Sequence, residues 1–252
     1  MRRAGGLGRE VAASVGASAR LLPHLPELLA DLNALGSSPR LVVAMLGRAG
    51  VKPRARVLDL ACGKGAVGIA VARGLSARVV GVDGFGPFLV AAREAAVRAG
   101  VAGRCEWVEG DVRRYRSRGG FDVAMMLGLF GVEEAVPILR RHTRAGGVYV
   151  VDDATCEEGA DAGLSRAEAR EVIEVGGDRI IEVSRQTPSA ARRQNAALFS
   201  RLRERARRLA REKPALAKDL RQFLDGQRRA NRMLAGELRS TVWVVRRCGG
   251  RV

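Results

Sequence analysis

The sequence has few aromatic residues and few cysteines, and each shortage excludes a class of protein. Aromatic residues make up 4% of the 252 residues, so flat side chains on which unpaired bases could stack are scarce. Four cysteines lie far apart and form no CxxC pair, which is neither a disulfide framework nor a zinc site. They are Cys62, Cys105, Cys156 and Cys248.

Long apolar runs are also absent. No run approaches the roughly 18 residues that a membrane-spanning helix needs. The basic start Met1-Arg2-Arg3 is followed by Gly5 and Gly8, where a signal peptide has an unbroken apolar run. Together with the unpaired cysteines, this predicts a cytoplasmic protein with no membrane partner.

Acidic residues are outnumbered, and the formal net charge is +17. Such a charge is typical of nucleic-acid binding. However, only four basic residues are lysines, and heavy use of arginine is also what a GC-rich genome produces. Residues 191–247 hold 17 Lys and Arg against 5 Asp and Glu. These form either a groove for RNA or an acidic substrate, or, as we favour, the solvated faces of two amphipathic helices.

What is present is an alternation of strands and helices. Strands are predicted at 57–60, 78–83, 104–108, 121–127 and 147–151, and helices at 68–75, 88–99 and 133–143. This order predicts parallel βαβ units. Right-handed crossovers then place the carboxyl ends of all strands at one edge of the sheet, where ligands bind.

The two ends of the chain differ from this middle part. Residues 7–49 are predicted to be helical, with one helix starting at Pro39 behind a serine cap. Strands at 179–183 and 241–246 flank two helices, 191–212 and 215–238. We expect four parts: an N-terminal helical cap (1–50), a core (51–187), a helical insertion (188–240), and the last core strand with the tail (241–252).

A glycine-rich loop follows the first strand. Gly63-Lys64-Gly65-Ala66-Val67-Gly68 matches GxGxxG, and Asp83 closes the next strand. This pattern alone is a weak dinucleotide fingerprint. Asp59 favours S-adenosylmethionine over NAD, because a carboxylate there suits a cationic amino-acid tail and would repel a pyrophosphate. Asp111 after the third strand suits an adenine amino group, and neither tyrosine has a lysine four residues on.

These segments together resemble the class I S-adenosylmethionine-dependent methyltransferases. Residues 57–65 resemble motif I of that family, 81–83 its second-strand acid motif, and 109–112 its third motif. Residues 121–124 and 144–150 resemble its fourth and fifth strands. The resemblance covers about residues 40–153 and implies a Rossmann-like, seven-stranded, mostly parallel sheet whose last strand is antiparallel, with helical additions at both ends.

The resemblance also implies a set of cofactor-binding residues. Gly63 and Gly65 would pass under the methionine part, Asp59 would orient the amino group, and Asp83 would hold the ribose. Asp111 and Val112 would frame the adenine. Three further residues of these loops complete the predicted cofactor site: Ala61, Gly84 and Leu127. The alternative for the three aspartates is capping of strand ends without a ligand.

The methyl acceptor is harder to predict, because transfer from a sulfonium needs little beyond an in-line nucleophile. Met125-Met126-Leu127 replaces the Asn-Pro-Pro-Tyr motif of enzymes that methylate exocyclic amino groups of bases. After the fifth strand, Asp153 is a candidate catalytic base and Asp152 a candidate substrate ligand; the alternative is a solvated turn or helix cap. The fourth strand offers no acid, so no metal is expected.

Three polar residues in the helical parts are further candidates for substrate contact. Gln227 and Asn231 fall on an apolar helical stripe, where polar groups need partners. We favour hydrogen bonding within the helices over contact with substrate. His24 lies in the N-terminal helices, which often cover the active site in the family. The run from Leu22 to Pro39, with Gln227 and Trp243, also resembles a bacterial group of small methyltransferases whose acceptors are undefined.

The sequence therefore predicts an S-adenosylmethionine-dependent methyltransferase that acts on O, N or S of a small-molecule acceptor. One alternative is an RNA or protein methyltransferase that uses the basic C-terminal helices. Another is a cofactor-binding protein without catalysis.

Overall fold

The computed structural model describes residues 10–32, 37–156 and 163–249. The chain divides into two compact units. The sheet unit comprises Ala34–Arg185 and Ser240–Val252, and the helical unit comprises Met1–Asn33 and Gln186–Arg239. The helical unit is thus assembled from two segments that are far apart in the sequence.

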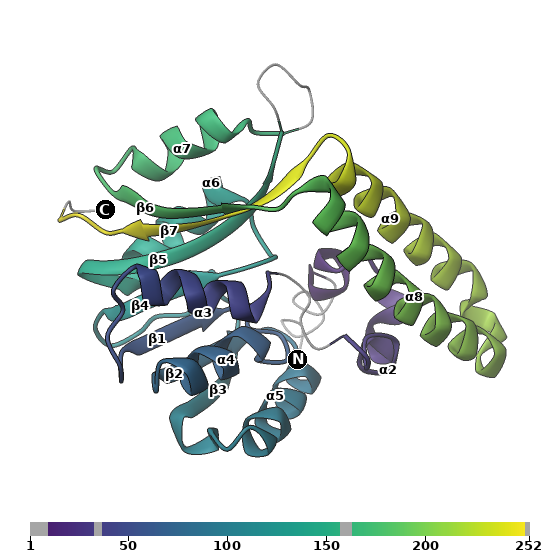
Figure 1. The fold of residues 1–252 in the computed structure, drawn as a ribbon. Coiled ribbons are helices and arrows are strands. Elements are labelled where there is room, and N and C mark those ends of the chain that lie inside the picture. Colours follow the sequence, from purple (N-terminus) through teal and green to yellow (C-terminus); the bar gives the residue numbers. More distant parts are fainter. Residues whose placement is uncertain (1–9, 33–36, 157–162, 250–252) are drawn as a thin grey trace. The chain divides into compact units, whose positions relative to one another are not determined.

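A seven-stranded sheet with strand order β3-β2-β1-β4-β5-β7-β6 forms the centre of the sheet unit (Figure 1). The first five strands are parallel, and β7 is antiparallel to β6. This confirms the predicted Rossmann-like sheet with its antiparallel last strand. The strands are β1 (Arg56–Leu60), β2 (Arg78–Asp83), β3 (Cys105–Glu109), β4 (Phe121–Met126), β5 (Thr143–Thr155), β6 (Arg179–Arg185) and β7 (Arg239–Arg246).

Helices cover both faces of this sheet. On one face α3 (Pro39–Arg48), α4 (Ala66–Gly74) and α5 (Gly86–Arg98) pack on Val57 of β1 and Val123 of β4. On the other face α6 (Val132–His142) and α7 (Arg166–Glu174) pack on Leu58 and Ala124. Because successive strand residues point to opposite faces, strands buried on both faces are apolar throughout, as β1 and β4 nearly are.

Two elements of the sheet unit differ from the prediction. Strand β5 begins at Thr143, directly after α6, rather than at Gly147. The register between β5 and β4 shifts near this start. Gly146 adopts a positive φ of 73° in this irregular segment. Helix α7 was not predicted, although its capping box is visible in the sequence: Ser165 and Glu168 bond each other's backbone N–H groups.

The helical unit contains a hairpin of α8 (Pro188–Glu212) and α9 (Ala217–Ala235), joined through a short 3₁₀ turn, η3 (Pro214–Leu216). Within the region predicted to be helical, residues 7–49, the structure has a 3₁₀ turn, η1 (Ala19–His24), followed by one short helix, α2 (Leu25–Leu28). Pro23 lies inside η1, where its missing N–H interrupts an α-helix. Residues 33–36 of that prediction lie outside the described ranges.

Ion pairs tie the two segments of the helical unit together. Asp31 pairs with Arg205 of α8 at 2.6 Å, and Asp219 of α9 pairs with Arg20 at 3.0 Å. Leu25 and Leu28 are buried, as are Leu202 and Leu209 of α8 and Leu220 of α9. Helix α3 packs on the sheet, so residues 1–50, predicted as one N-terminal cap, fall into both units.

Candidate cofactor and methyl-transfer site

The glycine-rich loop connects β1 to α4 at the carboxyl edge of the sheet. Three of its residues have left-handed backbone: Ala61 (φ 58°), Gly63 (φ 53°) and Gly65 (φ 74°). This conformation costs an alanine about 1–2 kcal/mol, so Ala61 stores strain. Strain of this kind persists only where the surroundings enforce it, which is common at ligand-binding loops.

Trp107 of β3 packs against the loop, and sequence reasoning missed it. A Cβ atom built on Gly65 would lie 2.5 Å from the Trp107 ring, and one built on Gly81 would lie 2.4 Å from it. Both glycines are therefore needed for close packing, in addition to the positive φ of Gly65. A glycine inside a strand, such as Gly81 in β2, is the sequence signal that indicates such an approach.

Asp59 lies near the end of β1 and is 3% exposed. Its Oδ2 accepts a hydrogen bond of 3.1 Å from the Gly68 amide in the first turn of α4. Burial is the main cause that raises the pKa of this carboxyl to about 7, and the nearby Asp83 adds to the effect. A cationic group beside Asp59 would favour its ionised form and relieve this cost.

Asp83, at the end of β2, connects the glycine loop to the next turn. Its Oδ2 accepts a 2.8 Å hydrogen bond from the Gly63 amide, and its Oδ1 accepts one of 2.9 Å from Phe85. Burial raises the pKa of Asp83, against the effect of these two bonds. A carboxylate has about four lone-pair positions, so two remain for further donors such as ribose hydroxyls. Gly84, which follows, is partly exposed.

The third strand ends beside the second. The Gly110 amide donates to the Asp83 carbonyl at 2.9 Å, and the side chain of Asp111 accepts from the Arg113 amide at 2.9 Å. Asp111 also pairs with Arg114 at 3.5 Å. Val112 is buried in the core under this edge. Asp111 is thus partly engaged in a local turn, while Asp59 and Asp83 are the buried acids of the edge.

Asp152, inside β5, connects this strand to the turn after β4. Its Oδ1 accepts from the Gly128 amide at 2.7 Å, and its Oδ2 accepts from the Ser37 hydroxyl at 2.7 Å. Asp152 is 8% exposed, and burial raises the pKa of its carboxyl. These bonds hold the turn after Leu127, which is itself packed against the core. Asp152 therefore organises this edge of the sheet.

Asp153 caps helix α6. Its Oδ2 accepts from the Val132 amide at 2.9 Å, and its Oδ1 accepts from the Ala154 amide at 2.7 Å. Val132 is the first residue of α6, and a Cβ on the preceding Gly131 would lie 2.8 Å from Asp153 Oδ2. An acceptor at this place satisfies one of the amides that a helix start leaves unpaired. The catalytic role predicted for Asp153 stays a prediction.

The other three candidates belong to the helical unit. Gln227 of α9 donates to the Val15 carbonyl at 2.9 Å, next to Gly16 with its φ of 73°. Its partner is thus the N-terminal segment, in line with the favoured alternative of internal hydrogen bonding. Asn231 of α9 and His24 at the end of η1 are partly exposed. Their predicted contact with substrate stays a prediction.

Neither a metal site nor a membrane span is found in the described part of the chain. In these residues no group of three or more His, Cys, Asp and Glu side chains could hold a metal ion. No helix among them is both long and apolar enough to cross a bilayer.

A comparison with known families decides what kind of domain this geometry belongs to. Residues 57–147, which run from β1 into β5, match the family described as "Methyltransferase domain". The chain carries a methyltransferase domain. The matched residues include the glycine loop, Asp83 and Asp111. No curated protein matches the chain.

Solved structures share the fold of this protein over most of the chain. An S-adenosylmethionine-dependent methyltransferase from Geobacter sulfurreducens, bound to S-adenosylhomocysteine, is 21% identical with a TM-score of 0.73; the match covers 88% of this chain and 96% of that one. The [4+2]-cyclase SpnF is 19% identical with a TM-score of 0.71, covering 90% and 95%. Coclaurine N-methyltransferase, bound to N-methylheliamine and S-adenosylhomocysteine, is 14% identical with a TM-score of 0.62, covering 83% and 70%. The predicted class I methyltransferase fold is confirmed.

Proposed function

We propose that the protein transfers a methyl group from S-adenosylmethionine to an O, N or S atom of a small-molecule acceptor. The observation that carries this proposal is the row of acids along one sheet edge. Asp59, Asp83 and Asp111 lie at or just past the carboxyl ends of three neighbouring parallel strands, and a strained glycine loop lies between the first two. All of them fall within the residues that match the methyltransferase family.

Each acid has a distinct role in holding the cofactor. Asp59 Oδ2 accepts from the Gly68 amide, so Oδ1 would accept from the cationic amino group. Asp83 keeps the loop closed through Gly63 and accepts from the ribose hydroxyls with its remaining lone pairs. Asp111 and Val112 would lie on either side of the adenine. Gly63 and Gly65 allow the backbone to approach the methionine part.

The protein has little covalent chemistry to perform. S-adenosylmethionine supplies a methyl group that its sulfonium already activates. The chain's residues hold the acceptor in line, which provides most of the rate enhancement in such transfers. Asp152 of β5 accepts hydrogen bonds from Ser37 and Gly128, and these bonds fix the turn after β4 that contains Leu127. If the acceptor must lose a proton early, Asp153 is our candidate base at this edge.

A small acceptor is supported by the chain itself and by one similar structure. The turn after β4 reads Leu127-Gly128-Leu129, and lacks the Asn-Pro-Pro-Tyr sequence that accompanies methylation of exocyclic amino groups of bases. Coclaurine N-methyltransferase, of the same fold, was solved with the small amine N-methylheliamine.

Calorimetry with S-adenosylmethionine, S-adenosylhomocysteine and NAD tests the cofactor. We expect the first two to bind and NAD to give no signal. Asp83→Asn should weaken binding by about a hundredfold, because losing a charged acceptor from buried hydrogen bonds costs roughly 2–3 kcal/mol. Glu106→Gln, an exposed change on β3, is the control and should bind as the unaltered chain does. Tight binding of NAD alone would overturn the proposal.

Turnover separates methyl transfer from the alternatives. Release of S-adenosylhomocysteine from panels of amines, phenols, carboxylic acids and thiols is the expected result. One rival is a different reaction on the same fold. The similarity to SpnF, a [4+2]-cyclase, favours it, because one fold can support several reactions. Tight retention of the cofactor without turnover on any panel would support that rival or a non-catalytic role. Salt-sensitive methylation of RNA would support the alternative based on the exposed arginines of α8.

A further inference from the structure

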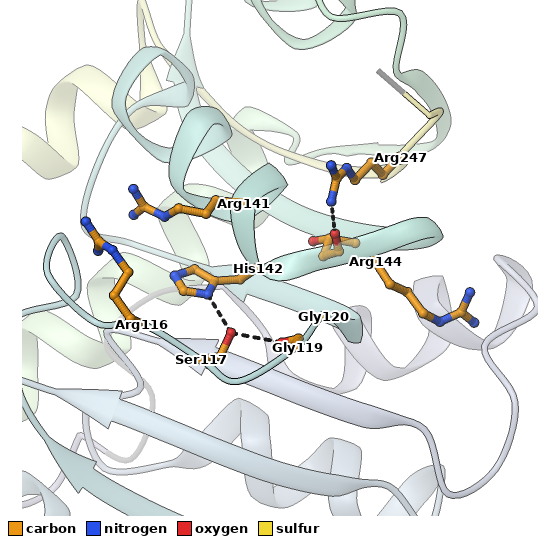
Figure 2. A pocket seen from close by; sticks show the side chains of 9 residues that line it. Arg116, Ser117, Gly119, Gly120, Arg141, His142, Arg144 and Arg247 are labelled. Atoms are coloured by element: carbon orange, nitrogen blue, oxygen red, sulfur yellow. Dashed lines mark hydrogen bonds between the residues drawn. The ribbon is translucent and has the colours of Figure 1, made fainter. Parts of the chain in front are cut away.

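A pocket lies at the sheet edge opposite the glycine loop, where β4 and β5 begin (Figure 2). Its volume is about 270 Å³. The loop before β4, the end of α6, the start of β5 and the residue after β7 form its wall. The side chains that matter for its chemistry are Arg116, Ser117, Arg141, His142, Arg144 and Arg247.

Four arginines line this pocket, and no carboxylate does. Arg144 is neutralised, because it pairs with Asp122 at 2.6 Å, and in Figure 2 it points away from the other three. Within the described ranges, Arg116, Arg141 and Arg247 form no ion pair with an acid. Three positive charges are therefore left uncompensated at one place, which costs free energy until an anion is present.

The guanidinium groups are held in place by backbone carbonyls. Arg116 donates to the carbonyls of Arg113 and Tyr115 at 3.0 and 2.9 Å. Arg141 donates to the same Arg113 carbonyl at 3.5 Å, so the two charges lie side by side, as Figure 2 shows. Burial and the nearby Arg116 lower the pKa of Arg141. Arg247 donates to the Thr143 carbonyl.

Two buried nitrogens in the pocket wall have no partner in the described part of the chain. They are Nε2 of His142 and Nε of Arg247. His142 is 1% exposed, and its Nδ1 lies 3.0 Å from the Ser117 hydroxyl. That hydroxyl also lies 3.0 Å from the Gly119 carbonyl. Of the two, Nε of Arg247 is a donor, and buried donors without partners are rare and indicate an unseen ligand, ion or water.

We propose that this pocket binds a small phosphate-bearing anion that carries at least two negative charges. Arginine is the side chain that best matches phosphate oxygens, because its planar fork donates two parallel hydrogen bonds. The volume is below the roughly 300–1,000 Å³ of pockets for drug-sized ligands, so it suits a diphosphate group rather than a large molecule. The site is separate from the methyl-transfer edge and does not depend on the proposed function.

The test measures binding of inorganic pyrophosphate to the full chain by calorimetry at low ionic strength. The double variant Arg116→Gln/Arg141→Gln should weaken binding at least tenfold. Both residues are exposed, so the fold should tolerate the change. The matched control Arg78→Gln/Arg98→Gln removes the same charge from exposed positions of the sheet unit, and its affinity should stay within twofold of the unaltered chain.

Binding of further ligands identifies the source of the phosphate. A nucleoside diphosphate that binds more tightly than pyrophosphate indicates a phosphorylated metabolite, and equal affinity indicates the free inorganic anion. An NMR titration of His142 provides a local readout, since its resonances should shift with pyrophosphate in the control and not in the pocket variant. Absence of saturable binding would overturn the proposal. Equal losses in both double variants, or binding of an RNA oligonucleotide without any response to pyrophosphate, would do so too.

Discussion

At the scale of single residues, the glycine loop is maintained by groups in unfavourable states. Ala61 is left-handed, and Asp59 and Asp83 are buried acids whose pKa values burial raises. The energy stored in these groups is recovered only when a ligand supplies donors and positive charge. The cofactor edge is therefore less stable alone than with its ligand.

Asp59 makes stability depend on pH. The carboxyl has its ordinary pKa of 3.8 when unfolded and about 7 when folded, so the folded state binds its proton more tightly. Its contribution to stability is complete below pH 3.8 and is lost as the pH rises to 7. Asp59→Asn should remove roughly 4 kcal/mol of this pH dependence, measured by urea unfolding between pH 4 and 8.

The same titration should appear in cofactor binding. Affinity for S-adenosylmethionine should rise severalfold between pH 5.5 and 7, because the amino group requires ionised Asp59. The Asn variant should bind weakly at every pH in this range. A pH profile that is unchanged in the variant would show that another group titrates.

Gly65 and Trp107 provide a second test at this scale. Gly65→Ala should destabilise the protein by roughly 3 kcal/mol, the sum of its positive φ and overpacking against the ring. Gly100→Ala is the control, since Gly100 has a φ of 69° with nothing within 4 Å of an added Cβ, and it should cost about 1–2 kcal/mol. Adding Trp107→Leu to Gly65→Ala should recover part of the difference in urea unfolding. Equal losses in the two alanine variants would argue against the contact.

At the scale of elements, variants of Asp153 distinguish a helix-capping role of this residue from a catalytic one. Asp153→Ala should lower the stability by about 1–2 kcal/mol through the lost cap of α6. Asp153→Asn keeps an acceptor oxygen and should recover most of it. Ser165→Ala, which removes the cap of α7, is the control for stability. Turnover abolished in Asp153→Asn with stability unchanged would identify Asp153 as the base.

Much of the arrangement of elements could be predicted, because buried parallel strands are apolar on both faces and end in turn residues. The acids at the strand ends were located for the same reason. Trp107 was missed because its contact with Gly65 joins β3 to the glycine loop, two segments far apart in the sequence, and Gly81 in β2 was its one local signal. The start of β5 was missed because Gly146-Gly147 also describes a turn. Whether Asp153 contacts substrate or caps a helix depends on the position of α6, which sequence spacing does not give.

At the scale of the whole molecule, Gln227 ties one end of the chain to the other. Its side chain is the donor to Val15 within the helical unit. Gln227→Ala should speed hydrogen exchange of residues 10–17, because a hydrogen bond of about 1 kcal/mol is lost, and should leave the sheet unit unaffected. Asp225→Ala, an exposed change on the same helix, is the control. Loss of acceptor turnover with unchanged exchange would instead support contact with substrate.

The helical unit has a consequence for how the chain is made. Its first segment ends at Asn33, and its second begins at Gln186, so a ribosome completes most of the sheet unit before α8 and α9 exist. Leu21, Leu25 and Leu28 are buried in the finished protein and must wait for their partners throughout that interval. Strand β7, which pairs with β6, is made later still. The nascent chain therefore exposes an apolar segment and an open strand edge, and chaperones should bind it during synthesis.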